Sequence, residues 1–206
     1  MRSDRLRRVA WIGGLIAGIL LIVAGAAWIY IGADARNEVQ DTITREQIVG
    51  SPDMSPEGIA PGIEEAGIEV DVPDCDVAGE PIDSGERARC FAEYMRIHAL
   101  EGTGGRTYSE MGRFLDPSGE EVNTEQEAAK GPNGRPVPNP ARELWVSERA
   151  LATGLELAYV GEQVSLFSIA TGILFVVIGI GLLVMLTVGG VLVGRRDEPG
   201  APPRGG

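Results

Sequence analysis

The stretch VAWIGGLIAGILLIVAGAAWIYIGA, residues 9–33, decides the fold, because it holds no charged side chain over 25 residues. A helix needs about 20 apolar residues to cross the hydrocarbon core of a bilayer. Trp11 near one end, and Trp28 and Tyr30 near the other, fit the aromatic belts found at membrane–water interfaces. The sequence therefore predicts a transmembrane helix over residues 9–33.

A second charge-free stretch, residues 163–194, is 32 residues long and reads QVSLFSIATGILFVVIGIGLLVMLTVGGVLVG. It exceeds the length of a single span, and a tilted helix can accommodate the excess. A buried core helix is the alternative for either stretch, but globular cores rarely need such long apolar runs. The second stretch is thus predicted to be a second transmembrane helix.

Charge is distributed unevenly along the 206 residues. Residues 32–162 contain 27 acidic and 11 basic residues, a formal charge of −16, whereas the flanks contain 7 basic and 3 acidic residues. Arginines beside membrane helices prefer the cytoplasmic side. The flanking arginines nearest the apolar stretches are Arg2, Arg5, Arg7, Arg8, Arg195 and Arg196.

This charge pattern predicts a plasma-membrane protein with both termini in the cytoplasm, as residues 1–8 and 195–206. The acidic residues 34–162 are then extracytoplasmic. Ala24-Gly25-Ala26 also resembles a signal-peptide cleavage site. The apolar stretch continues beyond it, which favours an uncleaved anchor, and residues 34–162 lie outside under either alternative.

The predicted fold is mainly α: a two-pass transmembrane helical hairpin with a small, mostly helical extracytoplasmic domain. Small side chains at four-residue spacing let helices approach closely in lipid, and the candidates for helix packing are Ala10, Gly14, Gly18, Gly190 and Gly194. They predict packing of the two helices against each other. The alternative is a docking face for another membrane subunit.

Several elements are predicted in the middle segment. Residues 34–48 extend the first helix, the Pro- and Gly-containing residues 51–62 form a loop, and the alternation in 63–72 predicts a strand. The clearest helix covers residues 84–100, with Ser84 as its N-cap. Short helices are predicted at 109–114 and 124–130, and a Pro-rich linker at 131–140.

A last helix begins after Asn139 and Pro140, which suit the cap and the first turn of a helix. It covers residues 141–162 and continues without proline into the second apolar stretch. Together they predict a single helix of about 50 residues, about 80 Å long.

Cys75 and Cys90 are the only cysteines. In an oxidising compartment they predict a disulfide that closes a loop of about 15 residues. A metal site formed with His98 is the alternative, although Cys90 and His98 do not share one clean helix face.

The sequence contains little that points to catalysis or to cofactors. His98 is the only histidine and is read as a packing or hydrogen-bonding residue. An acidic cluster, Glu69, Asp71, Asp74 and Asp76, offers oxygen ligands for Ca²⁺, but a solvated surface is the commoner outcome. No catalytic residue, metal site or cofactor is predicted, and the negative charge disfavours nucleic acid.

Two stretches, FAEYMRIHALEGTGGRTYSEMGRF (residues 91–114) and PNGRPVPNPARELWVSERALATGL (residues 132–155), resemble a family of small two-helix membrane proteins from actinobacteria. The resemblance implies a topology and supplies no catalytic residues. Members are often labelled as aromatic ring-opening dioxygenases. Such a non-haem iron site uses two histidines and a carboxylate, and this chain has one histidine.

These observations lead to three hypotheses about function. The first is a non-catalytic accessory or scaffold subunit of an envelope complex, whose partners are the lipid bilayer and another membrane or envelope protein. The second is a ligand- or cation-binding ectodomain that acts as a sensor. The third, a membrane-bound enzyme, is the weakest because no catalytic motif is present.

Overall fold

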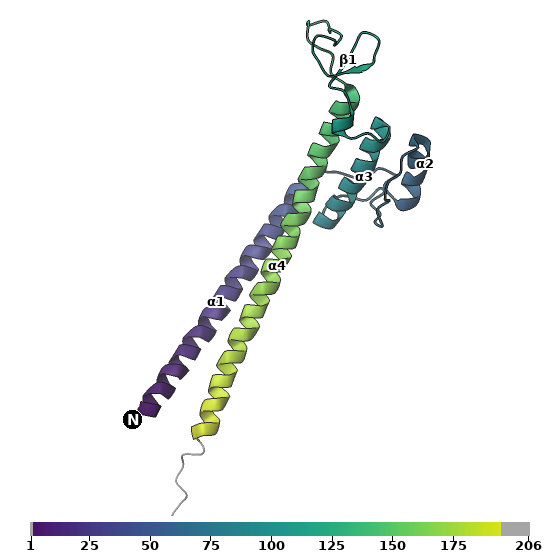
Figure 1. The fold of residues 1–206 in the computed structure, drawn as a ribbon. Helices are drawn as coiled ribbons and strands as arrows, with labels where there is room; N and C mark the ends of the chain where they lie inside the picture. The colour runs from purple at the N-terminus through teal and green to yellow at the C-terminus, as the bar shows by residue number, and fades with distance from the viewer. Residues whose placement is uncertain (1, 195–206) are drawn as a thin grey trace, which may run out of the picture. The chain divides into compact units, whose positions relative to one another are not determined.

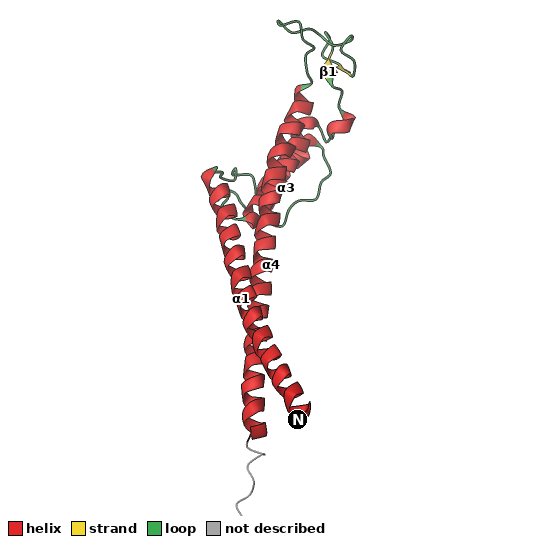
Figure 2. Ribbon diagram, turned by 90° about the vertical axis from the view of Figure 1, so that its left-hand side faces the viewer, coloured by secondary structure: helices red, strands yellow, loops and turns green. Residues whose placement is uncertain are grey.

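The structure, a computed structural model, describes residues 2–194, together with the side chains of residue 5 and of residues 8–188. It is mainly helical (Figure 1). The described elements are α1 (Arg2–Arg45), α2 (Pro56–Ala66), α3 (Gly85–Thr103), the 3-10 helix η1 (Tyr108–Glu110), β1 (Phe114–Leu115), β2 (Glu121–Val122) and α4 (Pro140–Gly194). Figure 2 shows how little of the chain is strand.

Two of these helices, α1 and α4, are long and apolar enough to cross a membrane. The chain divides into two compact units. The helix-pair unit consists of Met1–Ala35 and Val164–Gly206, and the middle unit is Arg36–Gln163. Both long helices contribute residues to both units, since α1 and α4 continue past the points of division.

The core of the middle unit forms around α3. Tyr94, Ile59, Ile82 and Val77 are the largest side chains that are almost fully buried. Ala152 and Leu155 of α4 and Ile43 of α1 belong to the same cluster. The apolar spacing of α3 therefore serves to bury one face against chain segments that precede and follow it.

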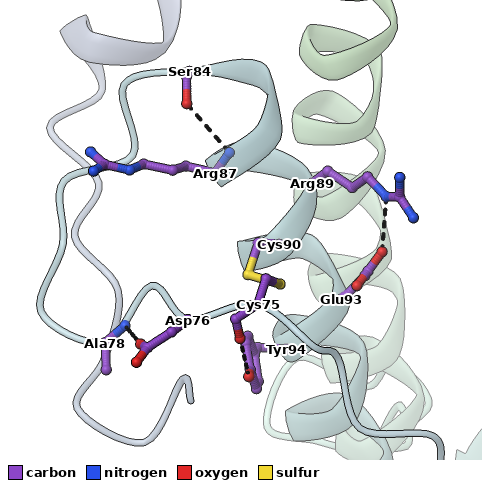
Figure 3. Close-up of a disulfide and its surroundings, with 9 residues drawn as sticks. All are labelled: Cys75, Asp76, Ala78, Ser84, Arg87, Arg89, Cys90, Glu93 and Tyr94. Carbon is purple, nitrogen blue, oxygen red and sulfur yellow. Dashed lines mark hydrogen bonds and ion pairs between the residues drawn. A yellow bond between two sulfur atoms is a disulfide. The ribbon is translucent and has the colours of Figure 1, made fainter. Parts of the chain in front are cut away.

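The predicted helix at residues 84–100 is confirmed and is slightly longer, as α3. The Ser84 side chain accepts a hydrogen bond from the Arg87 backbone N–H at 3.4 Å (Figure 3). Gly104, with φ of 62°, ends the helix in the left-handed conformation that glycine adopts readily. The extension of the first helix is also confirmed, because α1 continues to Arg45.

The prediction of a loop at residues 51–62 is wrong, as is the strand at 63–72. Ser55 caps α2 by accepting from the Gly58 N–H at 3.1 Å, and Pro56 occupies the first turn, where its missing N–H costs nothing. Ile59 faces the core. Tertiary burial and a good cap thus outweigh the Pro and Gly content of this stretch.

The predictions of short helices at residues 109–114 and 124–130 are wrong. Residues 108–110 form η1, and Phe114–Leu115 and Glu121–Val122 form an antiparallel hairpin. Residues 124–128 are bends and turns, and Lys130 pairs with Pro136 in an isolated bridge. The Pro-rich residues 131–140 join this region: the Leu115 N–H donates to the Val137 carbonyl at 3.1 Å. Backbone pairing across the chain, invisible to local periodicity, accounts for these differences.

The single long helix predicted from Ala141 is confirmed as α4, which has 55 residues. Asn139 caps it as predicted, since its side-chain oxygen accepts from the Ala141 N–H at 3.1 Å. The Asn139 amide also donates to the Gly112 carbonyl at 3.0 Å, which ties the start of α4 to the hairpin region.

Candidate functional site

The most closely packed contact in the helix-pair unit lies between α1 and α4, which run side by side in Figures 1 and 2. A Cβ atom built on Gly25 would lie 2.5 Å from the carbonyl oxygen of Gly172, and one on Gly172 would lie 2.6 Å from the oxygen of Gly25. Neither position can hold a larger residue without backbone movement. Such close backbone approach is typical of helix pairs in lipid.

The same contact repeats at seven-residue steps. Gly18 faces Gly179, whose Cβ would lie 2.7 Å from the Gly18 oxygen, and a Cβ on Gly32 would lie 2.8 Å from the Ser165 oxygen. Each step of seven residues along α1 corresponds to a step of seven back along α4. This is the 3.5-residue periodicity of antiparallel helices that pack with a left-handed twist.

The predicted packing residues are only partly at this contact. Gly14 and Gly18 lie at this contact, because Cβ atoms built on them would lie 2.9 Å and 2.8 Å from the side chains of Leu186 and Leu183. Ala10 is exposed. Gly190 and Gly194 lie in α4, but their surroundings fall outside the described residues.

Sequence reasoning missed Gly25, Gly32 and Gly172. Their signal is the seven-residue spacing of Gly18, Gly25 and Gly32 on one helix and of Gly172 and Gly179 on the other. A search for four-residue spacing does not find it. The hydroxyl of Ser168 adds a polar contact, donating to the Trp28 carbonyl at 3.1 Å.

In the middle unit, Cys75 and Cys90 form the predicted disulfide, with their Cα atoms 6.1 Å apart (Figure 3). The bond joins the loop before α3 to the first half of that helix. The Tyr94 hydroxyl, one turn further along, donates to the Cys75 carbonyl at 2.7 Å. Burial raises the pKa of Tyr94, so the hydroxyl stays protonated and able to donate.

Glu162 is a buried carboxylate at a junction of three helices. Its Oε2 accepts from the Gly85 N–H at 2.6 Å, at the start of α3, and its Oε1 accepts from Arg36 Nε of α1 at 3.0 Å. A negative charge at a helix N-terminus is favourable. This role could not be predicted from the sequence, because Glu162 is one of many acidic residues in the middle unit.

His98 is a hydrogen-bonding residue, as predicted: its Nε2 lies 3.1 Å from Asp53 Oδ2. A hydrogen bond from Ser51 is the main reason that the pKa of Asp53 is lowered, and the charge of His98 contributes less. Asp53 therefore links Ser51 and His98.

The acidic cluster Glu69, Asp71, Asp74 and Asp76 does not form a coordination shell. Among the described residues, no three His, Cys, Asp or Glu side chains come together so that they could hold a metal ion. Asp76 instead accepts from the Ala78 N–H at 2.9 Å, in a local turn. Cys90, which lies in the disulfide, is not available to ligate a metal with His98.

Comparisons of the chain with known proteins and structures found no relative. No protein-family model, no curated protein and no solved structure matches the chain.

Proposed function

We propose that the chain is a non-catalytic accessory or scaffold subunit, anchored in the plasma membrane by two helices. In this topology both termini are cytoplasmic and residues 34–162 are extracytoplasmic. Support comes from the basic flanks of the apolar stretches, from the two helices long enough to span a membrane, and from the disulfide.

One observation carries the scaffold part of this proposal: α4 has an exposed apolar face within the middle unit. Val146 is 50%, Leu157 65% and Val160 52% exposed, and Ala150 lies between them on the same side. Their spacing of four, seven and then three residues places them on one helix face. We name these four residues the outer apolar face.

The outer apolar face lies opposite the buried side of α4, where Ala152 and Leu155 join the core. Val146 precedes residue 163 by 17 positions, about 25 Å of helix, so it lies well before the charge-free stretch begins. An apolar stripe outside a membrane segment is typical of a surface that contacts another protein. We propose that it contacts another membrane or envelope protein.

The experiment is affinity purification of the full chain from membranes in mild detergent, with Ala150→Glu and Leu157→Glu variants beside the wild type. We expect a partner in constant proportion to the wild type and its loss from both variants, because a buried carboxylate is costly. Ala60→Glu is the matched control, since Ala60 is an exposed alanine on α2. Recovery of the bare chain, or loss of the partner with Ala60→Glu too, would contradict the proposal.

A further inference from the structure

A cavity of about 520 Å³ lies in the middle unit where η1, β1 and the start of α4 meet. Its lining includes Tyr108, Arg113, Phe114, Arg142 and Glu143. Cavities of this size are in the range used to bind small molecules or parts of larger ones. We name it the arginine cavity, because two guanidinium groups line it.

Arg142 is placed to receive an anion. Its guanidinium carbon lies 3.9 Å from the centre of the Tyr108 ring, so one face of the group is stacked. Stacking occupies the face of the guanidinium and leaves its N–H donors at the edge. The Nε atom is buried and has no hydrogen-bond partner among the described residues. A buried donor on a charged group costs free energy unless it meets an acceptor.

Arg113 repeats the arrangement, with its guanidinium carbon 5.4 Å from the centre of the Phe114 ring. Within the part of the chain that the structure describes, neither Arg113 nor Arg142 forms an ion pair, although the middle unit is strongly acidic. Five of the other eight arginines of the same unit have a carboxylate oxygen within 3.3 Å: Arg36, Arg87, Arg89, Arg106 and Arg149.

Two further features set the charge of the cavity. It lies at the N-terminal end of α4, where the helix dipole adds partial positive charge. Glu143 also lines it and opposes an anion, so the side chains together carry one positive charge. A guanidinium can hold a carboxylate or a phosphate through two parallel hydrogen bonds.

We propose that the arginine cavity binds an oxyanion, a carboxylate or a phosphate, through Arg113 and Arg142. The stacked rings orient the two guanidiniums, and Glu143 lowers the affinity. Val146 lines this cavity and also belongs to the outer apolar face, whereas Ala150 and Leu157, the residues that test the scaffold proposal, do not line it. The oxyanion proposal does not depend on the scaffold proposal.

The test uses the full chain purified in detergent, titrated with sodium phosphate or sodium acetate against chloride at constant ionic strength, with thermal unfolding as the readout. We expect a saturable rise in Tm with at least one anion. Arg113→Gln and Arg142→Gln should each weaken apparent affinity about tenfold, the loss of a charged hydrogen bond. Glu143→Gln should strengthen it.

Arg135→Gln is the matched control, because Arg135 is exposed in the same region and does not line the cavity. A response to phosphate alone identifies a phosphoryl ligand, and a response to acetate identifies a carboxylate. No saturable response to either anion, or an equal loss with Arg135→Gln, would overturn the proposal. If Arg142→Gln fails to fold, Arg113→Gln decides, since Arg113 is exposed.

Discussion

At the scale of single residues, Glu162 shows how one carboxylate can connect three helices. It accepts hydrogen bonds from the first residue of α3 and from Arg36, and its own side chain is only 5% exposed. A built Cβ on Gly85 would lie 2.7 Å from Glu162 Oε2, so the residue that opens α3 must be small. The start of α3 is therefore fitted to this carboxylate.

Replacing Glu162 by glutamine removes the charge while keeping the size of the side chain. We expect Glu162→Gln to lower the free energy of unfolding by about 1–3 kcal/mol, because charged hydrogen bonds are replaced by neutral ones. Chemical denaturation of the full chain in detergent measures it. Glu148→Gln, at a half-buried glutamate of the same helix for which no ion pair is recorded, should change little. Equal effects would contradict the assigned role.

Glu101 provides a pH-dependent prediction. Burial is the main cause that raises its pKa, and its Oε1 has no hydrogen-bond partner among the described residues. The Glu101 carboxyl therefore binds its proton more tightly in the folded chain than in the unfolded chain. Above the unfolded pKa of about 4.3, ionisation of this carboxyl lowers the free energy of unfolding. We expect Glu101→Gln to raise Tm at neutral pH.

The gain from Glu101→Gln should shrink as the pH falls to the unfolded pKa and below, where the carboxyl is protonated in both states. Thermal unfolding at several pH values measures this. Glu64→Gln, at an exposed glutamate of α2, should give no such trend. A gain that is constant with pH would show that ionisation of Glu101 is not the cause.

At the scale of elements, the glycine contacts between α1 and α4 are the feature that local reasoning found least well. Gly14 and Gly18 could be predicted from their spacing. Gly25 and Gly172 were missed, because their seven-residue spacing from Gly18 and Gly179 acquires a meaning only from the register between helices that are far apart in sequence. Helix α2 was missed for a similar reason. The cap at Ser55 and the burial of Ile59 stabilise a helix in spite of the prolines, and the burial depends on segments distant in sequence.

The glycine contacts predict opposite outcomes for one chemical change. Gly25→Ala and Gly172→Ala should each lower the Tm of the full chain in detergent, because the added methyl meets a backbone oxygen. Gly13→Ala and Gly181→Ala should keep or raise Tm, since a built Cβ at either position meets nothing within 4 Å and alanine favours helix. Equal tolerance at all four positions would contradict this packing.

The Cys75–Cys90 disulfide could be predicted from composition alone, whereas its partner contact from Tyr94 needed the fold. Replacing both cysteines by serine should lower the free energy of unfolding by about 3 kcal/mol, from the freedom restored to a loop of 15 residues in the unfolded chain. Denaturation of the two forms measures this. An unchanged denaturation midpoint would contradict this prediction. So would a wild-type chain whose mobility on a gel is the same with and without reductant.

At the scale of the whole molecule, the features predicted from sequence are those fixed by long runs of residues. The two apolar helices and the length of α4 follow from hydropathy and the absence of proline. The hairpin at Phe114–Leu115 and Glu121–Val122 and the arginine cavity depend on chain segments that meet only after folding. A candidate site formed by segments that are distant in sequence, such as the arginine cavity, could therefore not be predicted from the sequence.

In the proposed topology, two helices anchor the chain and place residues 34–162 outside the cytoplasm. The most direct test is labelling with a membrane-impermeant maleimide in intact cells, with Cys75 and Cys90 both replaced by serine. Glu120→Cys, at an exposed residue of the hairpin, should be labelled without permeabilisation, and Ser3→Cys only after it. Labelling of Ser3→Cys in intact cells while Glu120→Cys stays protected would contradict the proposed topology.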